Sequence, residues 1–231
     1  MQLNFIDLST VPHGAIAPLL EKLPPVEKNR LLQYHQPEDR LRGVAGRLLL
    51  QNLLQQEGFG EDVLHRLKSD AYLRPYINDS VDFNVSHSGH LVVAALSRHG
   101  RIGIDVEEMN ELEVSDFDNF FTATELHYIR SGAAPMSRFY ELWTKKEAVM
   151  KANGKGMHLP VREIILHGNT ARCEQQEWQL VPVDLHPRYA CHVAMPAPFD
   201  GQINAVAFQF LHEGEGYRLK QLGRTGGNDQ E

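Results

Sequence analysis

Two carboxylates separated by a single residue lie in the segment Gly103-Ile104-Asp105-Val106-Glu107. On a strand, alternate side chains share a face, so Asp105 and Glu107 point together while Ile104 and Val106 point into a core. Neighbouring carboxylates repel each other unless a cation lies between them. Mg²⁺ suits such a site because it binds carboxylate oxygens and can bind the phosphates of a substrate at the same time. The alternative is a strand that ends in solvated acids, and the spacing alone favours that second interpretation.

A third carboxylate, Glu147, lies one helical turn before Lys151 on a predicted helix. The pair has the spacing of a surface salt bridge, which stabilises a helix by only a few tenths of a kcal/mol. Trp143 lies one turn earlier on the same side, so the pair borders a buried surface, where Glu147 would complete a metal site. Gly154 is placed to end this helix in the left-handed conformation. Gly154-Lys155-Gly156 also resembles a phosphate loop, but the earlier glycine of the nucleotide-hydrolase motif is missing.

The segment Asn84-Val85-Ser86-His87-Ser88-Gly89-His90 is dense in hydroxyls, imidazoles and glycine. Such a turn offers several donors to an anion at close range. A serine next to a histidine also suggests a hydrolase. Adjacent residues do not place a hydroxyl against an imidazole as a catalytic triad requires, and the Gly-x-Ser-x-Gly motif is absent, so anion binding is the favoured interpretation.

The elements that would position these groups alternate between helical and strand periods. We expect strands at 3–8, 82–86, 91–97 and 102–107, helices at 16–23, 37–56, 123–131 and 137–153, and strand-like segments within 161–211. Helix followed by strands, twice over, predicts an α+β fold of two similar lobes. We expect an N-terminal lobe of residues 1–106, a C-terminal lobe of residues 107–222, and a disordered tail at 223–231.

Composition narrows the class of protein. The 231 residues are 42% hydrophobic and 23% charged, with net charge −7, which argues against general nucleic-acid binding. The apolar runs are too short to span a bilayer and the N-terminus does not resemble a signal peptide, so we expect a cytoplasmic protein with no membrane partner and with Cys173 and Cys191 as thiols. A local basic cluster, Arg40, Arg42 and Arg47 with Arg74 later, suits a compact polyanion.

Taken in order, these motifs resemble the 4′-phosphopantetheinyl transferases of the larger, surfactin-synthetase-activating (Sfp) type. The resemblance rests on Phe83 to Ser88, on Gly103 to Glu107, on Trp143 to Lys151, and on the Phe120-Phe121-Thr122 segment with Glu125. It spans about residues 40–160. It implies a pseudo-dimer, in which two similar α+β lobes of one monomeric chain bind coenzyme A in the cleft between them.

The resemblance also implies roles for individual residues. Asp105, Glu107 and Glu147 would hold Mg²⁺ against the coenzyme A pyrophosphate. The expected contacts to coenzyme A are His87 at the pyrophosphate, Ser86 and Arg74 with Pro75 at the 3′-phosphate region, Arg42 and Arg47 near the adenosine end, and Lys146 and Lys151 beside the phosphates. Where many members have Gly-Lys-Pro, this chain has Leu73-Arg74-Pro75, which keeps the charge in a planar group.

The implied reaction is attack of an apo carrier-protein serine on the β-phosphate of coenzyme A, with release of 3′,5′-ADP. Glu147 is the expected base, with Glu107 as the alternative, while Lys151 and His87 stabilise the leaving side. The acyl, polyketide or peptidyl carrier would dock near Phe120 and Phe121, unless these are core residues. Two other classes stay open: a Mg²⁺-dependent phosphodiester hydrolase, and a silent module that binds coenzyme A or a carrier.

Overall fold

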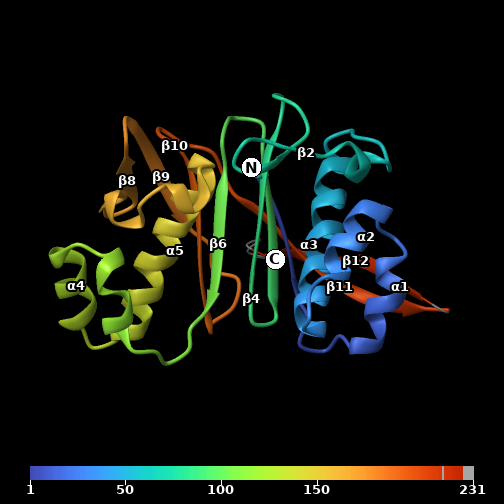
Figure 1. The fold of residues 1–231 in the computed structure, drawn as a ribbon, viewed down its shortest axis with the longest axis horizontal. Helices are drawn as coiled ribbons and strands as arrows, with labels where there is room; N and C mark the ends of the chain where they lie inside the picture. Colours follow the sequence, from blue (N-terminus) through green and yellow to red (C-terminus); the bar gives the residue numbers. More distant parts are fainter. Residues whose placement is uncertain (215, 226–231) are drawn as a thin grey trace, which may run out of the picture.

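Two long helices each cover one face of their own β-sheet. The computed structural model describes residues 1–214 and 216–225. Helix α3 (Pro37–Gln56) lies on one side of the molecule and helix α5 (Pro135–Asn153) on the other, with the strands of residues 82–108 between them (Figure 1). The α+β class and both of these helices were predicted from the apolar spacing of the sequence, and both predictions are confirmed.

The first sheet has five strands in the order β12-β11-β1-β5-β4. Their bounds are Gly216–Thr225 for β12, Asn204–Glu213 for β11, Gln2–Asp7 for β1, Leu91–Ser97 for β5 and Asp82–Ser88 for β4. β1 pairs in parallel with β11, and the other pairs are antiparallel. A short hairpin of β2 (Lys68–Ser69) and β3 (Pro75–Tyr76) precedes β4.

The second sheet is antiparallel, in the order β6-β10-β9-β8-β7. Its strands are β6 (Gly103–Glu108), β10 (Tyr189–Pro196), β9 (Gln176–Pro182), β8 (Thr170–Cys173) and β7 (Ile165–His167). The inner faces of the two sheets share one apolar cluster, in which Leu3 and Val93 of the first sheet join Ile104 and Val193 of the second. The helices and sheets therefore form a layered core.

The two sheets meet at their edge strands β4 and β6, a region we call the β4–β6 junction. Alternate side chains of β4 accept hydrogen bonds from backbone N–H groups of β6 and of Ile102 just before it, in place of the usual backbone ladder. The pairs are Ile102 N to Asp82 at 2.7 Å, Ile104 N to Asn84 at 3.0 Å, Val106 N to Ser86 at 3.3 Å, and Glu108 N to Ser88 at 3.1 Å. The polar alternation of this motif thus fixes the relative position of the two sheets.

The remaining helices are short. They are α1 (Ile16–Leu20), α2 (Pro25–Leu32) and α4 (Ala123–Arg130), with 3₁₀ turns at His13–Ala15, Val63–Arg66, Val114–Phe120, Gly156–His158 and Val161–Glu163. Thr122 and Glu125 cap α4 reciprocally, and Gly154 ends α5 with φ of 87°, as its position predicted. Helix α2 was not predicted. The helix expected at 16–23 does end before the proline pair Pro24-Pro25, as α1 ends at Leu20, but Pro25 begins a new helix, where its missing N–H costs nothing.

The chain does not divide between the sheets at one point. β6 begins at Gly103, within the range predicted for the N-terminal lobe, but it lies in the second sheet. β11 and β12 fall in the range predicted for the C-terminal lobe, but they extend the first sheet beside β1. Of the tail expected at 223–231, residues 223–225 belong to β12 instead, and residues 226–231 lie outside the described part. In the described part, no helix is long and apolar enough to cross a membrane.

Candidate active site

The predicted carboxylates meet where β6 faces α5. Asp105 is only 2% exposed, and its Oδ1 accepts from Lys151 Nζ at 2.6 Å and from Ser86 Oγ at 3.0 Å. Glu107 accepts from Ser88 Oγ at 2.7 Å. These contacts join β4, β6 and α5 at the β4–β6 junction, so residues 65 positions apart in the sequence share one site.

The electrostatics shows that Glu147 belongs to the same cluster. Burial raises the pKa of Glu147 from 4.5 to about 7, the negative charges of Asp105 and Glu107 add to this rise, and Lys151 opposes it. Burial, together with Asp105, also raises the pKa of Glu107. A pair of carboxylates shifts each other in this way only at short range, because water screens distant charges. The three acids therefore destabilise one another in the absence of a cation.

The donor set fits a hard cation in part. Asp105 Oδ2 is buried and has no hydrogen-bond partner, as expected for an oxygen whose partner is a metal ion. In the described residues, however, no group of three or more His, Cys, Asp or Glu side chains is gathered closely enough to hold a metal. The chemistry of Asp105, Glu107 and Glu147 suits Mg²⁺, and their side chains would have to close around it.

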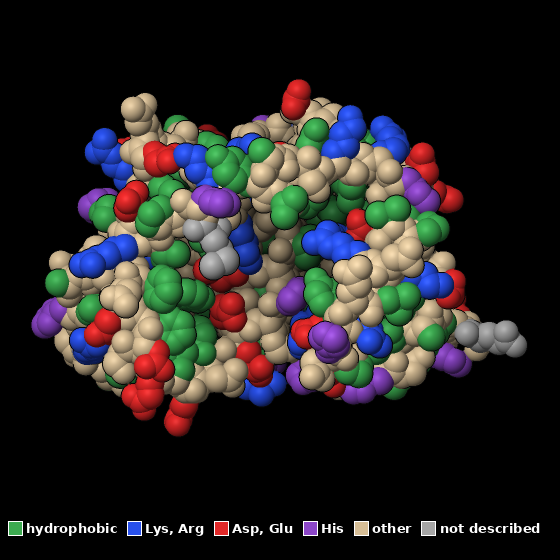
Figure 2. All heavy atoms as spheres, viewed as in Figure 1, with side chains coloured by type: hydrophobic (Ala, Val, Ile, Leu, Met, Phe, Trp, Pro, Cys, Tyr) green, Lys and Arg blue, Asp and Glu red, His purple; other side chains and the backbone are tan. Residues whose placement is uncertain are grey.

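A basic pocket of about 240 Å³ opens beside the carboxylates, between α2, α3 and β4. Of the predicted ligand contacts, Arg42, Arg47, Pro75 and His87 line it. Gly43 and Gly46 allow a close approach on this face of α3, because a Cβ would lie 2.4 Å from Leu31 Cδ2 and 2.9 Å from Val85 Cγ1, respectively, so these side chains would have to shift. The helix thus approaches its neighbours closely enough to shape the pocket. On the face of the molecule drawn in Figure 2, charged and histidine side chains line both walls of a central hollow.

The two predicted arginines of the pocket are already paired within the chain. Arg42 donates to the Gly89 carbonyl at 2.8 Å and to Asp39 at 2.6 Å, and Arg47 pairs with Glu27 at 2.5 Å. A ligand phosphate would compete with these carboxylates.

Sequence reasoning missed two further residues of the pocket, Arg30 and Tyr34. Arg30 belongs to α2, and Tyr34 follows its end. The signal that would have found them is the helix itself, which the proline pair concealed.

His87 lines the pocket and directly follows Ser86, the buried partner of Asp105. The pKa of His87 is lowered, first by loss of water around the ring and then by the positive charges of Arg42 and Lys151. The ring is therefore neutral at pH 7, and a nearby anion would favour its protonation.

Four of the eight predicted contacts do not line this pocket. Ser86 and Lys151 lie at the carboxylate cluster instead, whereas Arg74 and Lys146 lie at neither. Arg74 is 7% exposed and donates to Asp82 at 2.6 Å, to the Ile102 carbonyl at 2.8 Å and to the Lys151 carbonyl. The guanidinium group of Arg74 is therefore occupied by hydrogen bonds inside the β4–β6 junction. Arg74 instead borders a separate open pocket that Asp79 and Arg101 also line.

The other is Lys146, which has no exposed surface and binds Glu125 at 3.1 Å and the Ile164 carbonyl at 2.8 Å. The physical reason is helical geometry: successive residues of a helix point about 100° apart, so Lys146 faces away from Glu147 and Lys151. Ser86 does reach the site, as a buried partner of Asp105 and Lys151.

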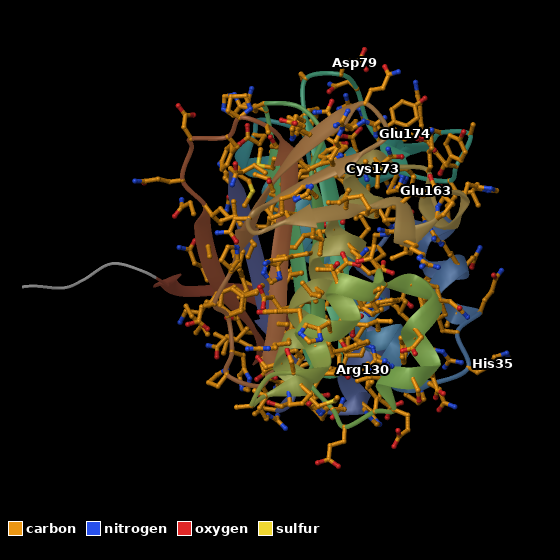
Figure 3. All side chains as sticks on the ribbon, turned by 90° about the vertical axis from the view of Figure 1, so that its left-hand side faces the viewer. His35, Asp79, Arg130, Glu163, Cys173 and Glu174 are labelled. Atoms are coloured by element: carbon orange, nitrogen blue, oxygen red, sulfur yellow. The ribbon has the colours of Figure 1, made fainter. Side chains whose placement is uncertain are left out.

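The aromatic pair divides between core and surface. Phe121 is 1% exposed and packs edge-on against Phe139, whereas Phe120 is 37% exposed beside Trp143. Hydrophobic side chains gather on this face over α4 and α5 (Figure 2). Cys173, labelled in Figure 3, and Cys191 are buried free thiols, as predicted.

Comparisons with known proteins agree with these features. A model of the "4′-phosphopantetheinyl transferase superfamily" matches residues 101–194, and one of "4′-phosphopantetheinyl transferase, N-terminal" matches residues 14–99. The first therefore contains all three carboxylates and Lys151, and the second contains the basic pocket.

Three curated relatives carry the same description. The 4′-phosphopantetheinyl transferase gsp of Aneurinibacillus migulanus is 33% identical over 62% of this chain and 61% of its own length. Sfp of Bacillus subtilis is 29% identical over 59% of this chain and 62% of its own length, and HetI of Nostoc sp. is 29% identical over 85% and 82%. The chain thus spans about three fifths of the length of the first two relatives.

Among solved structures, the holo-[acyl-carrier-protein] synthase of Thermotoga maritima is 16% identical, with a TM-score of 0.37, over 54% of this chain and 84% of that one, a likeness too distant to carry a conclusion. The two family models together cover most of the chain, including both walls of the site. The chain therefore belongs to the 4′-phosphopantetheinyl transferase family.

Proposed function

We propose that this protein transfers the 4′-phosphopantetheine group of coenzyme A to a serine of an apo carrier protein and releases 3′,5′-ADP. One observation carries the proposal. A cluster of three carboxylates and Lys151 lies beside a basic pocket, which is the arrangement that transfer of a phosphate-bearing group needs. The names of the relatives supply the chemical class.

The donor would enter through the basic pocket. Arg30, Arg42 and Arg47 offer three guanidinium groups around a pocket of about 240 Å³, and His87 lines the same pocket near Lys151. A guanidinium group can donate two parallel hydrogen bonds to the oxygens of one phosphate, so these arginines suit the 3′-phosphate and pyrophosphate of coenzyme A. His87, neutral in the free chain, would gain a proton beside the pyrophosphate and stabilise the leaving side together with Lys151.

Asp105, Glu107 and Glu147 are the residues that would hold Mg²⁺. When bound, the ion would neutralise charge on the pyrophosphate and relieve the repulsion among the three acids. The buried, unpartnered Asp105 Oδ2 supports this assignment.

Proton removal from the carrier serine is assigned to Glu147, with Glu107 as the alternative. Both side chains are half-buried and both have a raised pKa, so either is a stronger base than an exposed glutamate. General-base catalysis contributes about 10²–10⁴-fold in rate. Glu147 is preferred because its pKa, about 7 in the metal-free chain, is matched to neutral pH.

We further propose that the chain is a monomeric pseudo-dimer with the active site between its lobes. Each lobe would comprise a five-stranded sheet and one long helix, α3 or α5, and β11 and β12 would belong to the first lobe. The carrier would dock beside Phe120, whose exposed ring and apolar surroundings suit an interface anchor, whereas Phe121 belongs to the core. An acidic carrier would be attracted little by a chain of net charge −7, so this apolar patch matters more.

The proposal is tested by incubating the protein with Mg²⁺, coenzyme A and a panel of apo acyl, polyketide and peptidyl carriers, with intact-mass analysis of each carrier. We expect one carrier to gain the phosphopantetheine mass, and Asp105→Ala to abolish the gain. Asp79→Ala is the matched control, because Asp79 is an exposed acid on the loop before β4 (Figure 3) and does not belong to the cluster. If no carrier is modified while coenzyme A still binds, the protein is a binding module. Carrier-independent cleavage of a phosphodiester would instead identify a hydrolase.

A further inference from the structure

Lys151 lies on one oxygen of Asp105, a carboxylate that the proposed metal site also uses. Its Nζ lies 2.6 Å from Asp105 Oδ1 and 2.8 Å from Ser86 Oγ, and its side chain is 27% exposed. Asp105 itself is almost completely buried. A buried carboxylate needs a positive partner, and in this structure the ammonium group of Lys151 supplies it.

Ser86 completes a closed hydrogen-bond network around this ion pair. Its hydroxyl donates to Asp105 and accepts from Lys151 and from the Val106 N–H at 3.3 Å. One donor and two acceptor positions are all that a hydroxyl has, so Ser86 is fully used. The network fixes Lys151 against one oxygen of Asp105 and leaves the other, Oδ2, without a partner.

The charges of the cluster do not balance. One ammonium group faces three acids, Asp105, Glu107 and Glu147, which repel one another. Lys151 therefore neutralises only part of the charge that a divalent cation would neutralise. A second positive ion that binds the same acids must also share Asp105 with the ammonium group.

We infer that Lys151 is an internal counter-ion that competes with the divalent cation for Asp105. Without metal, Lys151 binds Asp105 and reduces the repulsion among the three acids. When the cation binds, Lys151 is displaced from Asp105 and becomes available to the phosphates of the donor. The inference rests on the metal site of the proposed function and adds a second role for a residue assigned there only to the leaving side.

The local structure allows this exchange without movement of the backbone. The Lys151 carbonyl accepts a hydrogen bond from the buried Arg74, and α5 ends two residues later at Asn153. The backbone of Lys151 is thereby fixed, while its long side chain, partly in solvent, is free to change rotamer. Displacement is thus a side-chain rotation.

Metal affinity tests the competition directly, with Mn²⁺ as the probe and neither coenzyme A nor carrier present. Free Mn²⁺ is titrated by electron paramagnetic resonance. We expect Lys151→Met to bind Mn²⁺ about tenfold more tightly or better, since it removes the competing charge at contact distance. Ser86→Ala keeps every charge but removes one of the two anchors of Lys151, so we expect a smaller gain of about two- to fivefold. Lys155→Met, which removes a lysine paired with the exposed Glu174 (Figure 3), should leave the affinity unchanged.

Acetylation of the wild-type chain gives a second measurement that needs no variant. Brief treatment with acetic anhydride, followed by peptide mass analysis, reports how accessible each lysine is. We expect labelling of Lys151 to rise on addition of Mn²⁺, with Lys155 as the internal reference. Unchanged or weaker Mn²⁺ binding by a folded Lys151→Met variant overturns the inference, and so does unchanged labelling of Lys151 under Mn²⁺ saturation. Because neither measurement requires transfer, failure here is distinguishable from failure of the carrier assay.

Discussion

The basic pocket and the carboxylate cluster are adjacent, but they differ in how far their charges are neutralised by partners within the chain. In the pocket, Arg42 is paired with Asp39 and Arg47 with Glu27, so these positive charges are balanced within the chain. In the cluster, three acids share one lysine, and the pKa of Glu147 rises to about 7. The charges of Arg42 and Arg47 are thus balanced where a ligand would be held, whereas the charges of the acids are unbalanced where chemistry would occur.

The difference indicates which groups can tolerate change. Ion pairs near the surface, such as Arg42 with Asp39, can exchange partners at little cost, because an exposed ion pair contributes only up to about 1 kcal/mol to the free energy of unfolding. Buried and unbalanced groups cannot relax in this way, because each depends on a partner that the fold places there. We therefore expect substitutions in the cluster to affect turnover, and substitutions in the pocket to affect affinity.

Asp105→Ala should have the largest effect. Asp105 connects Ser86 and Lys151 and carries the unpartnered oxygen of the cluster, so we expect transfer to fall at least about 10³-fold. The fold should survive, because Lys151 is partly exposed and can find water. Carrier modification is measured by mass spectrometry and folding by thermal melting. Mg²⁺-dependent turnover at the wild-type rate would remove Asp105 from the metal site.

Arg74→Met should cost stability rather than affinity. The substitution leaves Asp82 and the carbonyls of Ile102 and Lys151 without their buried donor, and loss of one partner of a buried ion pair costs about 3–5 kcal/mol. Urea unfolding measures this loss, with Arg101→Met as the control because Arg101 is exposed. Unchanged stability together with weaker coenzyme A binding would return Arg74 to the ligand site, where the sequence placed it.

The sequence alone was sufficient for the groups that follow a simple period. Alternation put Asp105 and Glu107 on one face of a strand, and helical spacing put Glu147 and Lys151 together. The same alternation in Asp82, Asn84, Ser86 and Ser88 carries the β4–β6 junction, although its acceptor role required the partner strand.

Other features have no local signal. Arg74 points inward because Leu73 adopts φ of 64° in a hairpin that Asp70 stabilises, a conformation unusual for leucine. The return of β11 to the first sheet depends on parallel pairing with β1 some 200 residues away, for which the sequence shows no marker. Long-range pairing and special backbone angles thus account for most of what the sequence did not predict.

Glu147→Gln should separate turnover from binding. The amide keeps the size of the side chain but cannot accept the serine proton, so we expect turnover to fall about 10²-fold or more. Coenzyme A affinity should change less than about threefold, because Glu147 does not line the pocket. Single-turnover transfer and calorimetric titration measure the two quantities. Equal transfer rates in the variant and wild type would transfer the base role to Glu107.

The unbalanced acids also predict a pH dependence of stability in the metal-free chain. Because the pKa of Glu147 is raised from 4.5 to about 7 on folding, the folded state binds more protons than the unfolded state between these values. Stability should therefore fall as pH rises from about 4.5 to about 7, by about 1–3 kcal/mol after allowance for screening. Urea unfolding in EDTA measures it as wild type minus Glu147→Gln. Parallel pH profiles for the two proteins would show that Glu147 carries no such repulsion, and Mg²⁺ should flatten the wild-type profile.

The smallest effects should come from the balanced pocket, and they have opposite signs. Arg42→Ala removes a guanidinium from the pocket wall and should weaken coenzyme A binding about tenfold, near 1.4 kcal/mol. Asp39→Asn keeps Arg42 but removes the carboxylate that holds it at 2.6 Å, so affinity should rise about two- to fivefold. Calorimetric titration of coenzyme A into each variant checks both values. If Asp39→Asn weakens binding instead, then Asp39 orients Arg42 for the ligand, and the pairs of the pocket support binding as they stand.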